Sequence, residues 1–362
     1  MKNRLYGLDV LRIISAIFVC AFHTNGHLGA TYGLLTEFVS MSAVFMTLFF
    51  ILSGYSLFIS NSDKSFLSGN TYSIYLKKRF ISIVPMYYIA SLIYVITEFV
   101  KSPGGGLLQT VVLFPIELLG IQSVFNSLFS LTHNGGTWFI SCILICYLIY
   151  PAIQEFVIRI SNKIKIFILL VMVFVLLYAP IVVWYFDLSS IYSNPFFRLL
   201  EFFIGVFIAS MKPSLDKMEF VKKYLYNWKY IILISALMVA GVTIAVNLEL
   251  NLDIAVGNYM LYSWICLPCF LALIVALSGV SFEKMNNKCR KILLSLSKMT
   301  YCLFLAQLFS NKISKVIIHR YSISNNLMII FIGWGVCILI TVLLHAGIEK
   351  RIKRCFKRLL LE

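Results

Sequence analysis

Charged residues are scarce in this sequence of 362 residues. Only 13% of them are Asp, Glu, Lys or Arg, whereas a soluble domain has about a quarter. Acidic residues are the rarest, with 15 Asp and Glu against 31 Lys and Arg. This composition excludes a chain that covers itself with a water-facing surface. No stretch outside the apolar segments is long enough for a second, soluble domain.

The chain also lacks internal repeats, low-complexity tracts and any recognisable nucleic-acid-binding module. Its net charge of +16 is therefore better explained by cytoplasmic loops that face anionic lipid than by nucleic acid. The nine cysteines lie mostly inside apolar runs. Cys266 and Cys269 form a CxxC without a second pair nearby, so we expect small buried hydrophobic residues and no metal site.

Long apolar runs are what the sequence has in abundance, since 60% of its residues are hydrophobic. A transmembrane helix needs about 20 mostly apolar residues. Ten segments satisfy this requirement: 8–28, 39–60, 80–100, 137–154, 166–184, 195–211, 228–246, 257–279, 293–311 and 327–347. The predicted fold is therefore all-α, a polytopic transmembrane bundle of about ten helices.

An eleventh segment, 107–121, is shorter and contains Pro115 and Glu117. If it does not cross the membrane, 26 of the 31 basic residues fall on one side, together with both termini. If it does cross, most of the positive charge lies outside. The positive-inside rule favours the first arrangement, with both termini cytoplasmic. Segment 107–121 is then an interfacial or re-entrant piece of the outer stretch 101–136.

Ionisable groups inside a bilayer are costly and therefore candidates for function. The first segment carries Asp9, Arg12, His23 and His27, which fall within about 60° of one another on a helix. Asp9 and Arg12 are three residues apart and could pair near the cytoplasmic edge, or bind lipid headgroups. His23 lies about 21 Å from Asp9 along the helix. It could be a reactive imidazole or a packing residue.

Polar residues also interrupt three other apolar segments. Arg198 and Glu201 are three residues apart and can form an ion pair. Ser53 and Gly54 lie within FFILSGYSLF, where a small pair permits another backbone to approach closely. Segment 293–311 is too polar to face lipid, so we expect it to line a hydrated cavity.

A basic cluster precedes the third segment, in LKKRFISIVPMYY (76–88). Its cations are Lys77, Lys78 and Arg79, at the cytoplasmic mouth of the expected helix. They could act only as topology determinants. They could equally hold phosphates, because the guanidinium fork of arginine binds phosphate oxygens well.

Seven motifs in this order resemble the acyltransferase-3 family of membrane acyltransferases, and the resemblance covers about residues 5–355. Residues 356–362 are then a short cytoplasmic tail. The motifs are LDVLRIISAIFVCAFH (8–23), FFILSGYSLF (49–58), KKRFISIVPMYY (77–88), GTWFISCILICYLIYP (136–151), FRLLEFFIGVFIA (197–209), SLSKMTYCLFLAQ (295–307) and HAGIEKRIKR (345–354).

The resemblance implies a multi-pass enzyme of the bacterial plasma membrane that takes acyl groups from acyl-CoA. Members modify hydroxyls on peptidoglycan, O-antigen, capsule, other sugars or lipids outside the cytoplasm. It implies no permanently bound cofactor, acyl-CoA (acetyl-CoA by family frequency) as donor, and an envelope glycan or lipid-linked sugar as acceptor. Membrane lipid is the surrounding partner, and homo-oligomerisation stays open.

By the same resemblance, His23 matches the essential histidine of the first helix, and Arg12 and Arg79 match conserved basic positions. An imidazole suits a general base, so His23 is assigned to deprotonate the acceptor hydroxyl. Arg198 and Ser53 are candidates for stabilising the oxyanion. The groups expected to bind the donor are Arg79, Arg12, Lys78 and Asp9, and chiefly Arg79 with Arg12 is expected to hold the CoA phosphates.

Two positions depart from the family pattern. The family often has a second arginine three residues after the one that matches Arg79, and here that residue is Ser82. It often has histidine where this chain has Gln307. A transporter or flippase of a polar lipid or acyl group is the alternative, since the same polar residues could form a translocation path. A non-catalytic sensor or partner subunit is a third interpretation.

Overall fold

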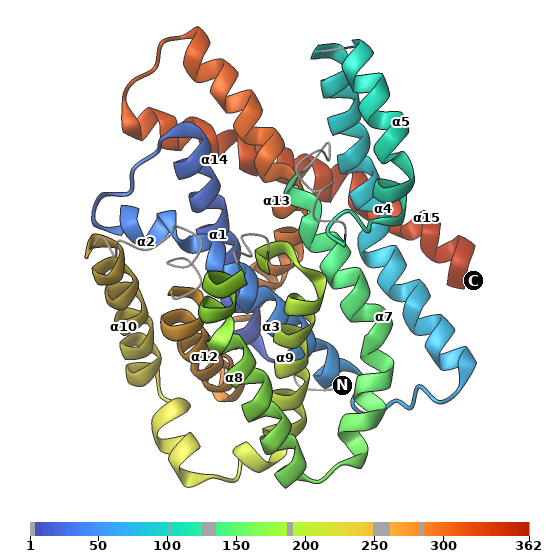
Figure 1. Cartoon of the computed structure of the whole chain (residues 1–362), viewed down its shortest axis with the longest axis vertical. Coiled ribbons are helices and arrows are strands. Elements are labelled where there is room, and N and C mark those ends of the chain that lie inside the picture. The colour runs from blue at the N-terminus through green and yellow to red at the C-terminus, as the bar shows by residue number, and fades with distance from the viewer. Residues whose placement is uncertain are drawn as a thin grey trace.

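The computed structural model describes most of the chain, namely residues 4–101, 103–124, 135–186, 191–248, 261–282 and 285–361. Within these ranges every regular element is a helix and none is a strand. Eight of the described helices are long and apolar enough to cross a membrane. The predicted all-α polytopic bundle is therefore confirmed (Figure 1).

Each of the ten predicted segments falls on a helix. The long helices are α1 (Tyr6–Leu28), α3 (Phe45–Asn61), α4 (Gly69–Lys101), α7 (Trp138–Arg159), α8 (Asn162–Phe186), α9 (Pro195–Leu215), α10 (Trp228–Asn247), α12 (Leu267–Gly279), α13 (Asn287–Arg320) and α14 (Asn326–Val342). Between and beyond them lie η1 (Gly33–Leu35), α2 (Thr36–Ser40), η2 (Ser42–Val44), α5 (Pro103–Leu119), η3 (Gly135–Thr137), η4 (Ile191–Ser193), η5 (Val221–Leu225), η6 (Leu261–Cys266), η7 (Leu343–Glu349) and α15 (Lys350–Leu361).

Three helices extend well beyond the predicted segments, and one of them is α13, which covers 287–320 where 293–311 was predicted. α4 begins at Gly69 rather than near residue 80, so the basic cluster lies within the helix. Its 33 residues span about 50 Å, longer than the hydrocarbon core of about 30 Å. At the other end of the chain, α14 continues through the π-helical turn η7 into α15. The expected boundary between domain and tail, at 355/356, therefore falls inside a continuous helix.

Helix α5 contains most of the eleventh candidate segment and doubles back along α4. The hydroxyl of Tyr88 on α4 donates to the carbonyl of Leu118 at 2.6 Å, and Tyr87 donates to the carbonyl of Glu117. The end of α5 therefore lies beside the middle of α4. Figure 1 shows the two helices as a hairpin at one side of the bundle.

The centre of the bundle is the contact between α3 and α9. A Cβ atom added at Gly54 would lie 1.9 Å from the carbonyl oxygen of Phe202. One added at Gly205 would lie 1.9 Å from the carbonyl oxygen of Ile51. Each glycine thus lets the backbone of the partner helix approach directly. This confirms the close approach predicted for Gly54 and assigns it to α9.

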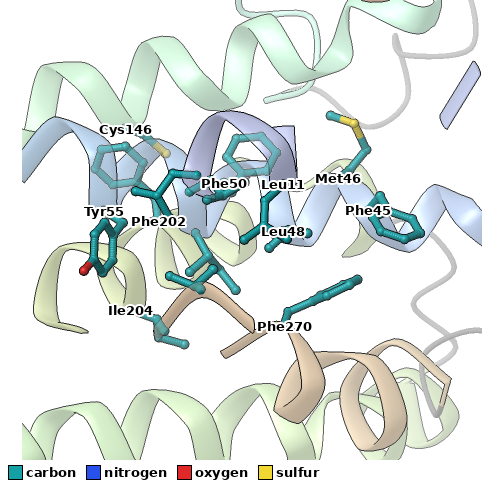
Figure 2. Close-up of a cluster of buried hydrophobic side chains, with 14 of the residues drawn as sticks. Leu11, Phe45, Met46, Leu48, Phe50, Tyr55, Cys146, Phe202, Ile204 and Phe270 are labelled. Carbon is teal, nitrogen blue, oxygen red and sulfur yellow. The ribbon is translucent and has the colours of Figure 1, made fainter. Parts of the chain in front are cut away.

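Large side chains fill the space around this contact (Figure 2). Phe45 and Phe50 of α3 lie near Phe202 and Ile204 of α9 and Phe270 of α12, and all five are buried. In lipid the hydrophobic effect does not drive helices together, so this core holds the bundle by close packing. α3 is packed tightly against α9 on one side, and its other side is free to line a cavity.

Candidate active site

A cavity of about 630 Å³ lies between α1, α3, α4, α7, α13 and the end of the last helix. α3 contributes a continuous face with the spacing expected of one side of a helix. The residues that line the cavity are Arg12, Met46, Phe49, Phe50, Ser53, Ser56, Leu57, Ser60, Arg79, Ser82, Ile83, Phe139, Ile143, Tyr147, Ser297, Lys298, Thr300, Tyr301, Phe304, His345, Glu349, Lys350 and Lys353. The prediction that segment 293–311 lines a cavity is therefore confirmed.

Basic side chains from α4, α13 and α15 gather on the wall of this cavity, in addition to Arg12 of α1. Arg79 comes from α4, Lys298 from α13, and Lys350 and Lys353 from α15. The guanidinium of Arg79 lies 5.7 Å from the ring centroid of Tyr75 and 5.6 Å from that of Tyr147. Its Nε is buried and has no hydrogen-bond partner among the described residues. This wall therefore has donors available to an anion.

Arg12 is the basic group contributed by α1, and its position is fixed by hydrogen bonds. Nη1 donates to Oδ1 of Asp9 at 3.2 Å and to Oγ of Ser297 at 3.1 Å. Nη2 donates to Oγ of Ser56 at 3.3 Å. Asp9 is buried and also accepts from Nε of Arg4 at 2.8 Å. The predicted ion pair thus exists, and it joins α1 to α3 and α13.

Aromatic rings occupy another part of the cavity wall. Phe49 of α3 and Phe304 of α13 meet edge to face, with ring centroids 4.7 Å apart. Phe139 of α7 lies 5.7 Å from Phe304 by the same measure. Met46 and Phe50, both labelled in Figure 2, also line the cavity. The cavity therefore combines a basic wall with an apolar one.

Ser53 and Ser82 also line the cavity. Ser53 faces away from the α3–α9 contact made by its neighbour Gly54. Its position in the cavity wall is compatible with the predicted oxyanion role, which stays a prediction. Ser82 lies one turn after Arg79 on α4. The position at which the family often has a second arginine is therefore part of the cavity wall in this chain.

Lys78 is exposed and is not among the residues that line the cavity. Of the predicted donor-binding groups, Arg79 and Arg12 reach the cavity directly, and Asp9 reaches it through Arg12. Arg79 and Lys78 are neighbours in the basic cluster and had the same predicted role, but only Arg79 lines the cavity.

Arg198 lies outside the cavity lining, in an enclosed site of its own. Nη1 donates to both carboxylate oxygens of Glu201 at 2.8 Å and to Oγ1 of Thr47 at 3.0 Å. Nε donates to the carbonyl of Tyr192 at 2.7 Å. The guanidinium also lies 5.2 Å from the ring centroid of Trp138. These contacts join α9 to its neighbours and leave Arg198 away from the cavity.

His23 is also not among the residues that line the cavity. Its ring stacks on that of His27, with centroids 5.6 Å apart and planes 7° apart. His23 is half-buried, whereas His27 is exposed. From Arg12 to His23 the helix rises by about 16 Å. His23 is therefore placed well beyond Arg12 along α1.

Sequence reasoning missed the polar cluster around Glu349. This carboxylate is hydrogen-bonded to Nδ1 of His345 and to the ammonium of Lys353, and it accepts from the thiol of Cys302 at 3.3 Å. The spacing of four residues between His345 and Glu349 was a usable signal, because such pairs meet on a helix. Near a membrane edge, however, a histidine commonly has an interfacial role, so this spacing alone does not predict a site.

Cys302, His345 and Glu349 are residue types that bind zinc, and their ligand atoms lie within 4.8 Å of one another. Here, however, both carboxylate oxygens of Glu349 already have partners, one of them the Lys353 ammonium. The cation that balances this carboxylate is thus a side chain of the protein. The geometry is that of a hydrogen-bonded cluster in the wall of the cavity.

Fold and cavity together describe a polytopic helical membrane protein with a cavity that is basic in one part and aromatic in another. The sequence identifies the family. The acyltransferase-3 family, described as "Acyltransferase domain", matches residues 5–346, nearly the whole chain. The chain belongs to this family and is a membrane acyltransferase. No curated protein and no solved structure gives a match to this sequence.

Proposed function

We propose that the protein moves an acyl group, acetyl in the simplest case, from cytoplasmic acyl-CoA to a hydroxyl of an envelope glycan or lipid-linked sugar across the bacterial plasma membrane. The observation that carries this proposal is the composition of the cavity wall, basic in one part and aromatic in another. Acyl-CoA has the same division, with phosphates at one end and the thioester at the other.

The donor is assigned to the basic wall. Arg79 has a buried Nε without a partner among the described residues, and a phosphate oxygen is the natural acceptor for it. Lys298 and Lys350 add charge around the same opening, whereas Lys353 is paired with Glu349. The cavity volume of about 630 Å³ lies within the range of about 300–1,000 Å³ common for ligand sites.

The assignment of this wall to the cytoplasm rests on the distribution of basic residues. Two exposed cysteines of the chain can be labelled to test this assignment. Cys289 at the start of α13 and Cys355 on α15 are exposed thiols in segments assigned to the cytoplasm. A membrane-impermeant thiol reagent should label them in inside-out vesicles and not in right-side-out vesicles. Labelling from the outer face would overturn the topology and the side from which the donor enters.

His23 is assigned as the general base that takes the proton from the acceptor hydroxyl. A neutral imidazole suits this task. Its place on α1, about 16 Å beyond Arg12 and outside the cavity lining, puts it toward the end of the helix that we assign to the acceptor. Ser53, in the cavity wall, is the candidate donor to the oxyanion. Arg198 has no part in this mechanism, because its hydrogen bonds hold it in an enclosed site.

The experiment is mass spectrometry of envelope glycans from cells that lack the gene, carry it, or carry His23→Ala or His27→Ala at equal protein level. We expect acylated glycan with the wild type and a loss of about 10²–10⁴ in rate with His23→Ala, the usual cost of losing a general base. His27→Ala, at an exposed position, should cost less. Near-normal acylation by His23→Ala would remove the base assignment. No difference between cells with and without the gene would contradict the proposed function.

A further inference from the structure

The cluster around Glu349 fixes the orientation of one imidazole in the cavity wall. His345 and Glu349 belong to the π-helical turn η7, an irregular turn of a kind often found at functional sites. A carboxylate can only accept, so the shared hydrogen bond places a proton on Nδ1 of His345. The other ring nitrogen of His345, Nε2, takes no part in this hydrogen bond. His345 lines the cavity, with 12% of its side chain exposed.

Glu349 is itself held firmly. Lys353 bonds to Oε1, and the Cys302 thiol donates to Oε2 at 3.3 Å. Its side chain is 6% exposed, so little water competes for these bonds. A carboxylate fixed in this way can orient a neighbouring imidazole and stabilise its charged form, as in carboxylate–histidine pairs of hydrolases.

The pair lies beside the aromatic part of the cavity. His345 lines the same cavity as Phe139 and Phe304. Phe139 also packs against the buried cluster that contains Cys302, the thiol partner of Glu349. His345 is one turn further from the basic helix α15 than Glu349. If the CoA phosphates bind Arg79, Lys298 and Lys350, the thioester can extend into the cavity toward these aromatic rings, on the wall that His345 also lines.

We propose that His345 is a second catalytic residue, a general acid that protonates the sulfur of CoA as the acyl group leaves, and that Glu349 is its positioning residue. This inference rests on the proposed acyl transfer. A thiolate released among aromatic rings is poorly solvated, so a proton donor there lowers the cost of breaking the bond.

The step balances. The acceptor oxygen forms a bond to the carbonyl carbon while its proton passes to His23. The carbon–sulfur bond breaks, its electron pair goes to sulfur, and sulfur takes the Nε2 proton of the His345 imidazolium. The products are the acyl ester and CoA thiol. His345 regains a proton from water at the basic opening, and His23 releases one.

The test varies the leaving group. Membrane vesicles containing equal amounts of wild type, His345→Asn or His23→Ala receive acetyl-labelled acetyl-CoA or the acetyl thioester of an aromatic thiol, and label in envelope material is measured. An aromatic thiolate leaves without protonation. His345→Asn should therefore lose about 10²-fold with acetyl-CoA and much less with the aromatic thioester. His23→Ala should lose the same factor with both donors, because it acts on the hydroxyl.

Glu349→Gln should also lose transfer from acetyl-CoA, by a smaller factor than His345→Asn, and should recover with the aromatic thioester. Glu349→Asp keeps the carboxylate and should restore part of the transfer that Glu349→Gln loses. If His345→Asn does not assemble, His345→Gln, a larger amide, replaces it. Equal losses with both donors, or wild-type transfer from acetyl-CoA by the His345 variants, would overturn the role of His345. A wild type that transfers label from neither donor would instead contradict the proposed function, and this inference with it.

Discussion

Arg198 and Arg79 are both arginines beside aromatic rings inside the bundle, yet their hydrogen-bonding groups are used differently. Arg198 is 2% exposed, and its donors are directed to Glu201, Thr47 and the carbonyl of Tyr192. Arg79 lies over two tyrosine rings at the edge of a large cavity, and its buried Nε has no partner among the described residues.

The difference teaches that a charge inside a membrane protein does not by itself mark the site of chemistry. A charge that is fully paired within an enclosed space ties helices together. A charge with unused donors beside a cavity is available to a ligand. Replacing Arg198 should therefore lower the stability of the protein, whereas replacing Arg79 should weaken ligand binding.

The largest effect should come from Arg198→Ala. Removing one partner leaves Glu201 as an unpaired charge in an apolar site, which costs about 3–5 kcal/mol in the free energy of unfolding. We expect little folded protein in the membrane and a much lower unfolding temperature in detergent, measured by size-exclusion chromatography after heating. The double variant Arg198→Met/Glu201→Leu should recover much of the loss. A stable Arg198→Ala protein that has lost only its transfer rate would return Arg198 to an oxyanion role.

Arg79→Ala should leave stability nearly unchanged and weaken donor binding. Losing hydrogen bonds to a charged group costs about 1.5–3 kcal/mol, which is about a ten- to hundred-fold weaker affinity for acetyl-CoA. Equilibrium binding of labelled acetyl-CoA to purified protein measures it. Lys163→Ala removes the same charge from an exposed site at the start of α8 and serves as the control. An unchanged affinity in Arg79→Ala would mean that Arg79 acts only in topology.

The neighbouring residues Gly54 and Ser53 sharpen the comparison, because they face opposite sides of α3. Gly54→Ala places a Cβ against the backbone of Phe202, so α3 and α9 must separate. We expect a loss of about 1–3 kcal/mol in the free energy of unfolding, as for other overpacked sites. Ser53→Ala is the matched control for stability and should change it by less than about 0.5 kcal/mol. Equal unfolding temperatures for the two variants would contradict the tight α3–α9 contact.

Much of the bundle followed from the sequence because membrane helices are long and apolar. Each of the ten segments falls on a described helix, and eight of the described helices are long and apolar enough to cross a membrane. In the sequence, Pro115, Glu117 and the distribution of charge set the short candidate 107–121 apart. The sequence also indicated the ion pair of Asp9 and Arg12, since three residues make one helical step. These features depend on local spacing or on composition, which a single sequence contains.

The remainder depends on contacts between segments far apart in the chain. Cys302 meets Glu349 only because α13 packs against the end of the last helix, and this brings His345 into the cavity wall. Helix spacing does not reveal that Arg198 is surrounded by Thr47 on α3 and Tyr192 on η4. Without these contacts, the sequence alone allowed Arg198 an oxyanion role. A buried charge in a sequence therefore predicts importance without distinguishing structure from chemistry.

The smallest expected effect comes from Ser82→Arg, which would place the second arginine of the family pattern in this chain. Ser82 lies three residues after Arg79 on the same face of α4 and lines the same cavity. A second guanidinium there should add a phosphate contact and tighten acetyl-CoA binding severalfold, about 0.5–1 kcal/mol. The gain is limited because two like charges one turn apart repel each other before the ligand binds.

The control for Ser82→Arg is Ser73→Arg, which adds the same charge to α4 at an exposed position that is not among the cavity residues. Binding of labelled acetyl-CoA at two salt concentrations distinguishes a direct contact from general attraction, since the latter is screened by salt. If both variants tighten binding equally and salt removes the gain, the cavity wall attracts the donor only through its net charge. If Ser82→Arg alone tightens binding, the phosphates lie along the α4 face that Arg79 begins.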